Sequence, residues 1–421
     1  MHKRLALCCL LLAPYFTAHD CEAQTPQLEV LISEALSRHP RLQALAALTR
    51  AQHHLESPAA AWPDPMVRFD LLNVPTSEWD FGSSPMSGRQ LGVAQRLPWP
   101  GRRDADRRLA STQTQIAAAR AADARAGIVD AVKQAYYELA FVDRALVITS
   151  RNQDLLRDFV RIAQTKYSVG RGRQQDILKA QVSLSGLGDR ILVLQARRDV
   201  AEARLNALRD REVTAPMPPP MRLEVTDFNQ SLTDLTRMAF EARPALAGLR
   251  HQVEHWQAAE EVARLATRPD IDVQLAYRQR SFDTDQVAGS DFVSAGIAVK
   301  VPLWRNSRQH QQAAAARQRQ AAATSELAAT KLDIELRLQE LLIKAGLHRA
   351  EMELLRDAIL PQAQQALTAS IAGYRVDHVD FLTLLDSQVT LQQFEIDLHR
   401  QHIDYERTLA SLEAVVGVRL F

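Results

Sequence analysis

Residues 89–103, RQLGVAQRLPWPGRR, join a strand pattern to the start of a very long helix pattern. In the first part, Leu91, Val93 and Leu97 alternate with polar or small residues, which is typical of a β-strand with one apolar face. The prolines and glycine at 98–101 end the strand, because proline lacks a backbone donor and glycine permits a sharp change of direction. We therefore expect a strand that leads directly into a helix.

The same alternation occurs in three other short stretches, 66–73, 271–278 and 293–301. Each of the four runs is about 8 to 10 residues long, which suits a strand that crosses a membrane at a tilt. They form two expected hairpins, 66–97 and 271–301. Two interpretations are open: a soluble sheet with one buried face, or a sheet with one face against lipid.

Long helix patterns follow both hairpins. Their apolar residues recur at alternating steps of four and three, as in coiled coils; the seams contain Ile128, Val132, Ala135, Leu139, Val142 and Leu146, and then Ile334, Leu338, Leu341, Ala345, His348, Met352, Leu355 and Ile359. The first pattern covers about 65 residues, or about 97 Å. The return helix from about 176 to 211 is about half as long, so we expect the helix from about 28 to 60 to flank the remainder. The helices predict a rod.

The chain contains an internal two-fold repeat. Residues 28–210 and 235–417 show the same order of features at an offset of about 204 to 207 residues, with His39-Pro40 corresponding to Arg243-Pro244. The predicted fold class is mainly α with a small β part. The expected divisions are a signal peptide at 1–23, a first structural repeat at 24–211 with a tip at 167–176, a Pro-rich linker at 212–230, and a second repeat at 231–421 with a tip at 374–383.

Composition excludes several classes of protein. With 51 Lys+Arg against 50 Asp+Glu, the formal net charge of +1 gives no general attraction to nucleic acid. Residues 1–23 are typical of a secretory signal, with lipidation of Cys21 as an alternative. No cysteine follows residue 21, so the exported chain has no thiol for catalysis. No nucleotide, nucleophile or zinc motif indicates an enzyme or a cofactor.

The exported part also lacks an apolar run of the roughly 20 residues that a membrane-spanning helix needs. Any membrane crossing is therefore expected from the strands, and no amphipathic helix remains to cover their apolar face. Four strands cannot close a barrel, and an open sheet edge in lipid leaves backbone groups unpaired. Closure would require other copies of the chain.

Essentially all of the exported sequence resembles the TolC family of outer-membrane efflux channels. The most specific segment is 95–103, QRLPWPGRR, which is similar to the branch associated with heavy-metal efflux, and the helix breaks at 167–170 and 374–376 are the second. The resemblance implies a homotrimer with one twelve-stranded barrel in outer-membrane lipid and a helical tube through the periplasm. It also implies two partners, a periplasmic adaptor protein and an inner-membrane efflux pump.

By the same resemblance, the two helix breaks are tips that dock with the adaptor, with candidate contacts at Val169, Gly170, Arg171, Gly172, Arg173, Asp377 and His378. A plain helix–helix turn explains the glycines equally well. The two arginines depart from the small apolar residues usual there and suit acidic adaptor groups. Asp377 stands where the first half has Gly170, and aspartate tolerates the left-handed backbone.

Asp386 matches a position at which the family places an acidic ring at the periplasmic entrance, with Asp380 and Thr383 nearby. Three copies of this gate would draw cations into a narrow tube. The alternative is a solvated carboxylate on a helix surface. Thr383 occupies a second gate position and is not acidic.

Other polar and aromatic residues have simpler explanations. Two histidine pairs have helical spacing that suits a metal ion, His251 with His255 and His399 with His402, but no third ligand is identifiable and no metal site is predicted. His348 is expected to form a polar layer in its seam, and Pro361 to kink its helix. Four tryptophans flank the strands as interface or core residues: Trp62, Trp79, Trp99 and Trp304.

The predicted function is a passive exit duct in the outer membrane that performs no chemistry on its cargo. Metal cations are suggested by similarity to one family branch alone. A soluble periplasmic coiled-coil scaffold or adaptor is the alternative.

Overall fold

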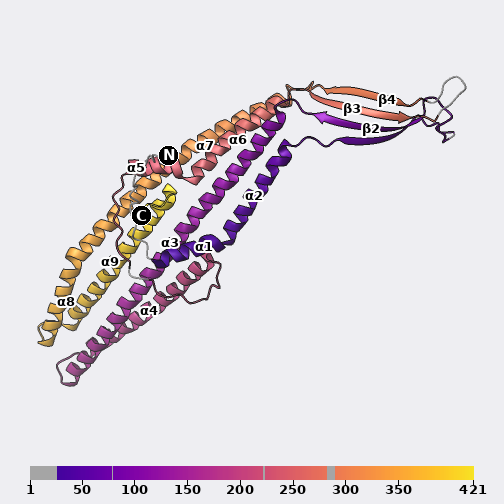
Figure 1. The fold of residues 1–421 in the computed structure, drawn as a ribbon. Coiled ribbons are helices and arrows are strands. Elements are labelled where there is room, and N and C mark those ends of the chain that lie inside the picture. The colour runs from indigo at the N-terminus through magenta and orange to yellow at the C-terminus, as the bar shows by residue number, and fades with distance from the viewer. Residues whose placement is uncertain (1–25, 78, 221–222, 282–289) are drawn as a thin grey trace, which may run out of the picture.

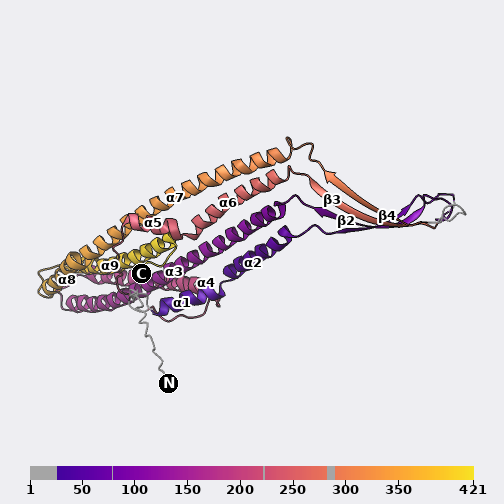
Figure 2. The ribbon, with the colours of Figure 1, turned by 45° about the horizontal axis from the view of Figure 1, so that its top comes forward.

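The computed structural model describes residues 26–77, 79–220, 223–281 and 290–421. The signal peptide expected at 1–23, with Cys21, lies outside the described residues. The molecule is a long rod of helices with a narrow sheet at one end and two helical tips at the other (Figures 1 and 2). The predicted rod is therefore confirmed for the single chain.

The chain contains, in order, α1 (Pro26–Arg38), α2 (Pro40–Ala60), β1 (Met66–Leu72), β2 (Gly88–Leu97), α3 (Arg102–Ser168), α4 (Gln174–Leu208), α5 (Leu232–Ala242), α6 (Pro244–Leu265), β3 (Asp270–Gln279), β4 (Phe292–Lys300), α7 (Gln309–Leu354), the π-helical turn η1 (Leu355–Ile359), α8 (Leu360–Arg375) and α9 (Phe381–Val416). Each half thus contains helices, a hairpin, a long helical segment and a return helix.

The long helices lie side by side in one layer. Both α2 and α4 pack along α3, which contacts α6 and α9 on its other side, and these pack in turn against α7. The helices α2 and α4 therefore form one edge of the layer, and α7 and α8 form the other. The belt, which comprises α1, α5 and residues 212–220 and 223–230, wraps the middle of the rod (Figure 2).

The single helix expected from about 28 to 60 is wrong. It is two helices, because Pro40 cannot donate a backbone hydrogen bond and forces the preceding residue out of the helical region; His39 has a ψ of 119° and caps α2 through its ring nitrogen. The second half breaks in the same way at Arg243-Pro244. Only α2 therefore flanks α3 in the rod, while α1 joins the belt.

The second long helix is irregular where Pro361 was expected to disturb it. One π-helical turn at 355–359 precedes α8, in which Pro361 is the second residue. Proline removes one backbone donor and crowds the carbonyl four residues earlier, and a π turn is one way to accommodate such a defect. The first long helix, α3, continues for 67 residues without one.

The four strands form one antiparallel sheet in the order β1-β2-β3-β4. The central pair, β2 and β3, joins the two halves of the chain, with Leu97 opposite Ile271. The outer strands, β1 and β4, each have a partner on one side alone among the described residues. The sheet therefore has two open edges.

Candidate functional site

The apolar residues of the sheet lie on one face and are exposed. Along the strand register, Val67 is opposite Val93, which is opposite Leu275, and the next row contains Phe69, Leu91, Tyr277 and Val293. Every one of these side chains is more than a third exposed. A soluble sheet would bury this face against another element, whereas no described helix covers it.

The opposite face of the sheet is polar and largely paired. Arg96 lies 3.1 Å from Asp272 on the neighbouring strand, and Arg68 lies 3.0 Å from Asp70. Arg278 donates to the side chain of Gln90 across the same β2–β3 pair. This arrangement, with one apolar and one polar face, is the pattern of a strand between lipid and water.

Three of the four tryptophans next to the strands are exposed rather than core residues. Trp79 is 81% exposed, Trp304 is 75% exposed and Trp62 is 54% exposed, while Trp99 is partly buried. Core packing therefore does not account for them.

The first tip is a tight turn between α3 and α4. Gly170 has a φ of +73°, which favours glycine, and a Cβ on Gly172 would lie 2.9 Å from the backbone nitrogen of Tyr167, so that position requires glycine. The adjoining Val169, Arg171 and Arg173 are exposed. The turn chemistry explains the glycines, and the exposed residues around them are free to contact another protein.

The second tip repeats this geometry with a different residue. Asp377 has a φ of +64°, which confirms that aspartate supports the left-handed position here, and His378 beside it is exposed. Gly373 approaches Val379 so closely that a Cβ would lie 2.5 Å from its side chain. The two tips lie at the same end of the rod (Figure 1).

Lys166 joins the two tips. Its ammonium group contacts the carboxylate of Asp377 and the backbone carbonyl of Tyr374, and lies 4.4 Å from the centre of the Tyr374 ring. The hydrogen bond from Lys166 lowers the pKa of Asp377 below its usual value. The Asp377 carboxylate is therefore already paired with a residue of its own chain.

The expected gate residues have separate roles. Asp380 caps α9 by accepting a 2.8 Å hydrogen bond from the backbone of Thr383, and bonds from Thr383 lower the pKa of Asp380. Asp386 is exposed and makes no ion pair with any residue that the structure describes. It precedes Asp404 by 18 residues, which is five full turns, so both lie on the same face of α9.

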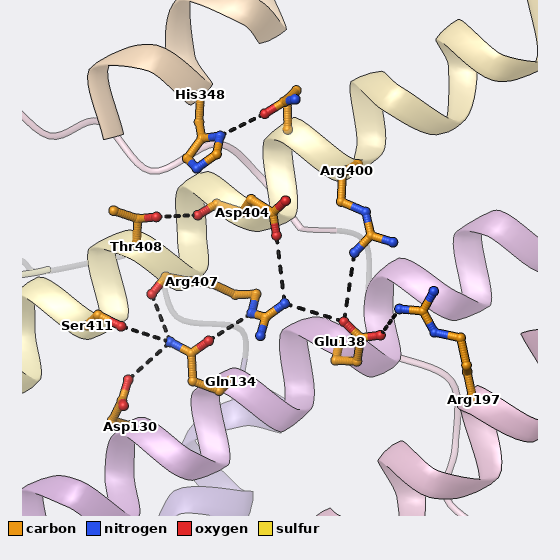
Figure 3. A network of polar contacts seen from close by, with 11 residues as sticks. Asp130, Gln134, Glu138, Arg197, His348, Arg400, Asp404, Arg407, Thr408 and Ser411 are labelled. Carbon is orange, nitrogen blue, oxygen red and sulfur yellow. Dashed lines mark hydrogen bonds and ion pairs between the residues drawn. The ribbon is translucent and has the colours of Figure 1, made fainter. Parts of the chain in front are cut away.

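That face of α9 also carries a polar network against α3 and α4, shown in Figure 3. Glu138 of α3 accepts from Arg197 of α4 and lies 3.4 Å from Arg407 and 4.0 Å from Arg400, both of α9. Gln134 accepts a 2.8 Å hydrogen bond from Arg407. One carboxylate thus joins three helices from both halves of the chain.

On the belt side, α9 binds the linker. Glu406 accepts hydrogen bonds of 2.8 Å from both the backbone and the hydroxyl of Thr226, and burial raises the pKa of Glu406. Burial likewise lowers the pKa of His402, whose Nε2 lies 3.9 Å from Glu406. Sequence reasoning missed this contact, because a single Thr in a Pro-rich linker carries no recognisable signal.

A buried ion pair joins the two halves at the same level. Lys133 of α3 is 1% exposed and lies 2.8 Å from Glu413 of α9, with the ring of the C-terminal Phe421 4.9 Å away. The sequence contained one indication of it, a lysine within the apolar pattern of α3.

The histidines are separated into different contacts. His348 shares a 2.7 Å hydrogen bond with Gln401, which is the expected polar layer between α7 and α9. His255 contacts Thr112 and Gln113. Among the described residues, no three side chains of the metal-binding types come together.

Within the described part of the chain, no helix combines the length and the apolar character needed to cross a membrane.

The family model of outer membrane efflux proteins matches residues 31–209. The cobalt-zinc-cadmium resistance protein CzcC of Cupriavidus metallidurans is 23% identical over 297 residues, which cover 70% of this chain and 69% of that protein.

Solved structures show the same fold. CusC matches with a TM-score of 0.80 at 15% identity, over 94% of this chain and 93% of that chain. The outer-membrane channel OprN matches with a TM-score of 0.79 at 16% identity, over 94% and 91%. VceC of Vibrio cholerae matches with a TM-score of 0.78 at 18% identity, over 93% and 96%.

A rod of paired helices with an exposed amphipathic sheet at its end is thus the fold that this chain shares with CusC, OprN and VceC. Through residues 31–209 the chain is similar to the outer membrane efflux protein family. The matching family and the solved structures of OprN and VceC are outer-membrane proteins.

Proposed function

We propose that three copies of this chain form a continuous exit duct across the outer membrane and the periplasm. The observation that carries the proposal is the four-stranded sheet, which has an exposed apolar face and two open edges. In lipid, an unpaired edge costs several kcal/mol per backbone group. Pairing β4 of one copy with β1 of the next closes a twelve-stranded barrel and leaves no edge.

The helical layer supports the same assembly. One edge of the layer, on α7, presents an aliphatic strip at steps of four and seven: Leu332, Leu336, Ile343, Leu347 and Leu354, all more than half exposed. The other edge, on α2 and α4, exposes Leu48, Leu55, Leu178, Val182, Leu192, Val193 and Val200. A heptad-spaced strip with nothing against it requires another helix, and the opposite edge of a neighbouring copy supplies one.

We further propose that the duct works with a periplasmic adaptor and an inner-membrane pump. The exposed tip residues Val169, Arg171, Arg173 and His378 would form the contact, and Asp386 would line the entrance. Asp386 and Asp404 lie on one face of α9, and Glu406, which binds the belt, lies on another. This placement of Asp386 away from the belt supports the gate. An exposed carboxylate repeated three times in a narrow entrance attracts cations.

Metal cations are the proposed cargo. Support comes from the relative named for cobalt, zinc and cadmium resistance. No described cluster would hold these cations in transit, and a duct needs no tight site because binding that is too strong prevents release.

The test is assembly followed by conductance. The full chain, purified from outer membranes, should run as a trimer and form channels in planar bilayers. Ile297 is 72% exposed on the apolar face, so Ile297→Arg should cost roughly 2 to 4 kcal/mol near the bilayer midplane and reduce assembled trimer. A freely soluble monomer would support the scaffold alternative instead.

A separate conductance measurement tests the proposed gate. Asp386→Asn should lower cation conductance of the assembled channel, with Asp158→Asn, an exposed carboxylate on α3 paired to Arg161, as the control. Equal conductance of the Asp386 variant and the unmodified channel would remove Asp386 from the gate while leaving the duct intact.

A further inference from the structure

Four crossings connect the sheet to the helices, at residues 61–65, 98–101, 266–269 and 301–308. Three of them carry a tryptophan, and the fourth carries Arg268. Residues from all four meet around the helical end of the sheet, where the strands begin and end (Figure 1). Because the strands are short, this ring of crossings is where the proposed membrane boundary falls.

Arginine side chains accompany the tryptophans. The guanidinium carbon of Arg268 lies 5.8 Å from the centre of the Trp99 ring. Arg103 lies 4.2 Å from the Trp62 ring and donates a 2.7 Å hydrogen bond to the carbonyl of Ala60. An arginine that lies over an aromatic ring at a surface places an apolar ring and a positive charge side by side.

The crossing between β4 and α7 is the most exposed of the four. Its turn is held by backbone hydrogen bonds from Arg308 to Trp304 and from His310 to Arg305. Trp304 and its neighbour Leu303 are about three-quarters exposed, and Arg305 and Arg308 are exposed beside them. Neither arginine makes an ion pair with a residue that the structure describes, so both guanidinium groups are available to an external anion.

Charge is concentrated at these crossings. Residues 61–66, 98–104, 264–270 and 300–308 contain seven Lys or Arg against three Asp, a net charge of +4, while the whole chain carries +1. The described residues at the other end of the sheet, 73–77, 79–89, 278–281 and 290–291, contain three Arg against two Asp, a net charge of +1. The helical end of the sheet therefore carries the larger positive charge.

We propose that these crossings form a collar that binds the phosphate groups of anionic glycerophospholipids in the leaflet facing the helices, through Trp62, Trp99, Arg268, Trp304, Arg305 and Arg308. The inference rests on the proposed function, because it requires the sheet to lie in a bilayer. Tryptophan settles at the headgroup level of a membrane, and arginine near an anionic surface gains about 1 kcal/mol per side chain. The collar thereby sets the depth and direction of the chain in the membrane.

Lipid selectivity tests the collar. The full chain is inserted into vesicles of phosphatidylethanolamine with phosphatidylglycerol and re-extracted, and the two retained lipids are counted by mass spectrometry. Unmodified chain should retain phosphatidylglycerol above its share of the input. The double variant Arg305→Gln with Arg308→Gln should lose this enrichment by roughly fivefold per arginine, whereas Arg305→Lys with Arg308→Lys should keep most of it.

The matched control is Arg337→Gln, which removes an exposed arginine on α7 far from the sheet, paired to Glu340 at 3.7 Å. It should leave the enrichment unchanged, and an equal loss would show that general charge, not the collar, selects the lipid. High salt, about 0.5 M, should weaken the enrichment of the unmodified chain through screening. The salt measurement still tests the collar if the glutamine variant fails to assemble. Enrichment that does not change with salt concentration would overturn the collar.

The outcomes separate the inference from the function on which it rests. Chain that enters neither kind of vesicle would overturn the proposed duct. Chain that inserts and conducts, but retains the two lipids in their input ratio, would overturn the collar alone. Inorganic phosphate should not displace phosphatidylglycerol, and displacement would assign the arginines to free phosphate instead of lipid.

Discussion

The contact between α3 and α9, which joins the two halves of the chain, differs between its belt end and its tip end. At the belt, Lys133 and Glu413 form a buried ion pair, and Glu138 binds arginines of two other helices (Figure 3). Nearer the tips, the buried side-chain amide of Gln388 lies 3.4 Å from the backbone carbonyl of Asn152 and 3.5 Å from its side-chain oxygen, the outer limit of a hydrogen bond.

This difference indicates where the two halves are held together. A buried charge without its partner is strongly destabilising, so the belt end resists separation. At the tip end, Gln388 is 1% exposed and its carbonyl oxygen has no hydrogen-bond partner among the described residues. The tips themselves are joined by Lys166 and Asp377 at the surface. We therefore expect local opening to begin at the tips.

Removing Glu413 should have the largest effect. Glu413→Ala removes the carboxylate that pairs with the buried Lys133, and should lower the free energy of unfolding by about 3 to 5 kcal/mol, as measured by denaturant unfolding of the purified chain. Glu340→Ala, which removes an exposed carboxylate at a weak surface pair, serves as the control and should change it by less than about 1 kcal/mol. Similar losses in both variants would show that the buried pair contributes no more than an exposed one.

Replacing Gln388, whose side-chain amide is poorly hydrogen-bonded, should change the free energy of unfolding in the opposite direction. Gln388→Leu removes a buried carbonyl without a partner from an apolar cluster that includes Leu384, Leu385 and Leu391. The change should be neutral or stabilise by up to about 1 kcal/mol. Hydrogen exchange of α9 near residue 388 should slow or stay the same, and faster exchange would show that the amide pair holds the helices together.

Acid should loosen the tip contact. The pKa of Asp377 is lowered by its bond from Lys166, so this stabilisation is complete above the ordinary aspartate pKa of about 3.9 and is lost as the pH falls through the lower folded value. Hydrogen exchange at 374–380 should therefore increase in strong acid. In Asp377→Asn, exchange at neutral pH should already be faster and its acid dependence smaller; identical profiles would show that the pair contributes nothing.

Much of the architecture was predictable from local patterns. Period-two alternation located the strands, and the steps of four and three located the seams on α3 and α7, because each pattern reports which face of an element is apolar. The tips were predictable from Gly170 and its counterpart Asp377, since both need a positive φ. The break at Pro40 was visible in the sequence, yet a continuous amphipathic pattern on both sides concealed it.

The candidate site was predictable only in part. The resemblance indicated the exposed tip residues and Asp386, but the capping role of Asp380 depends on which residue begins α9. The pairs Lys133–Glu413 and Glu138–Arg407 join residues about 270 to 280 positions apart, and no local pattern specifies such partners.

The amino-acid sequence alone determined that this protein has amphipathic strands, long coiled-coil helices and sharp glycine-dependent turns, because these follow from periodicity and backbone sterics within a few residues. Only the tertiary structure decided which charges are buried together, which face of α9 meets the belt and which edges of the sheet and the helical layer remain open. Those properties depend on the packing of segments far apart in the chain, where burial sets the energetic cost of each unpaired group.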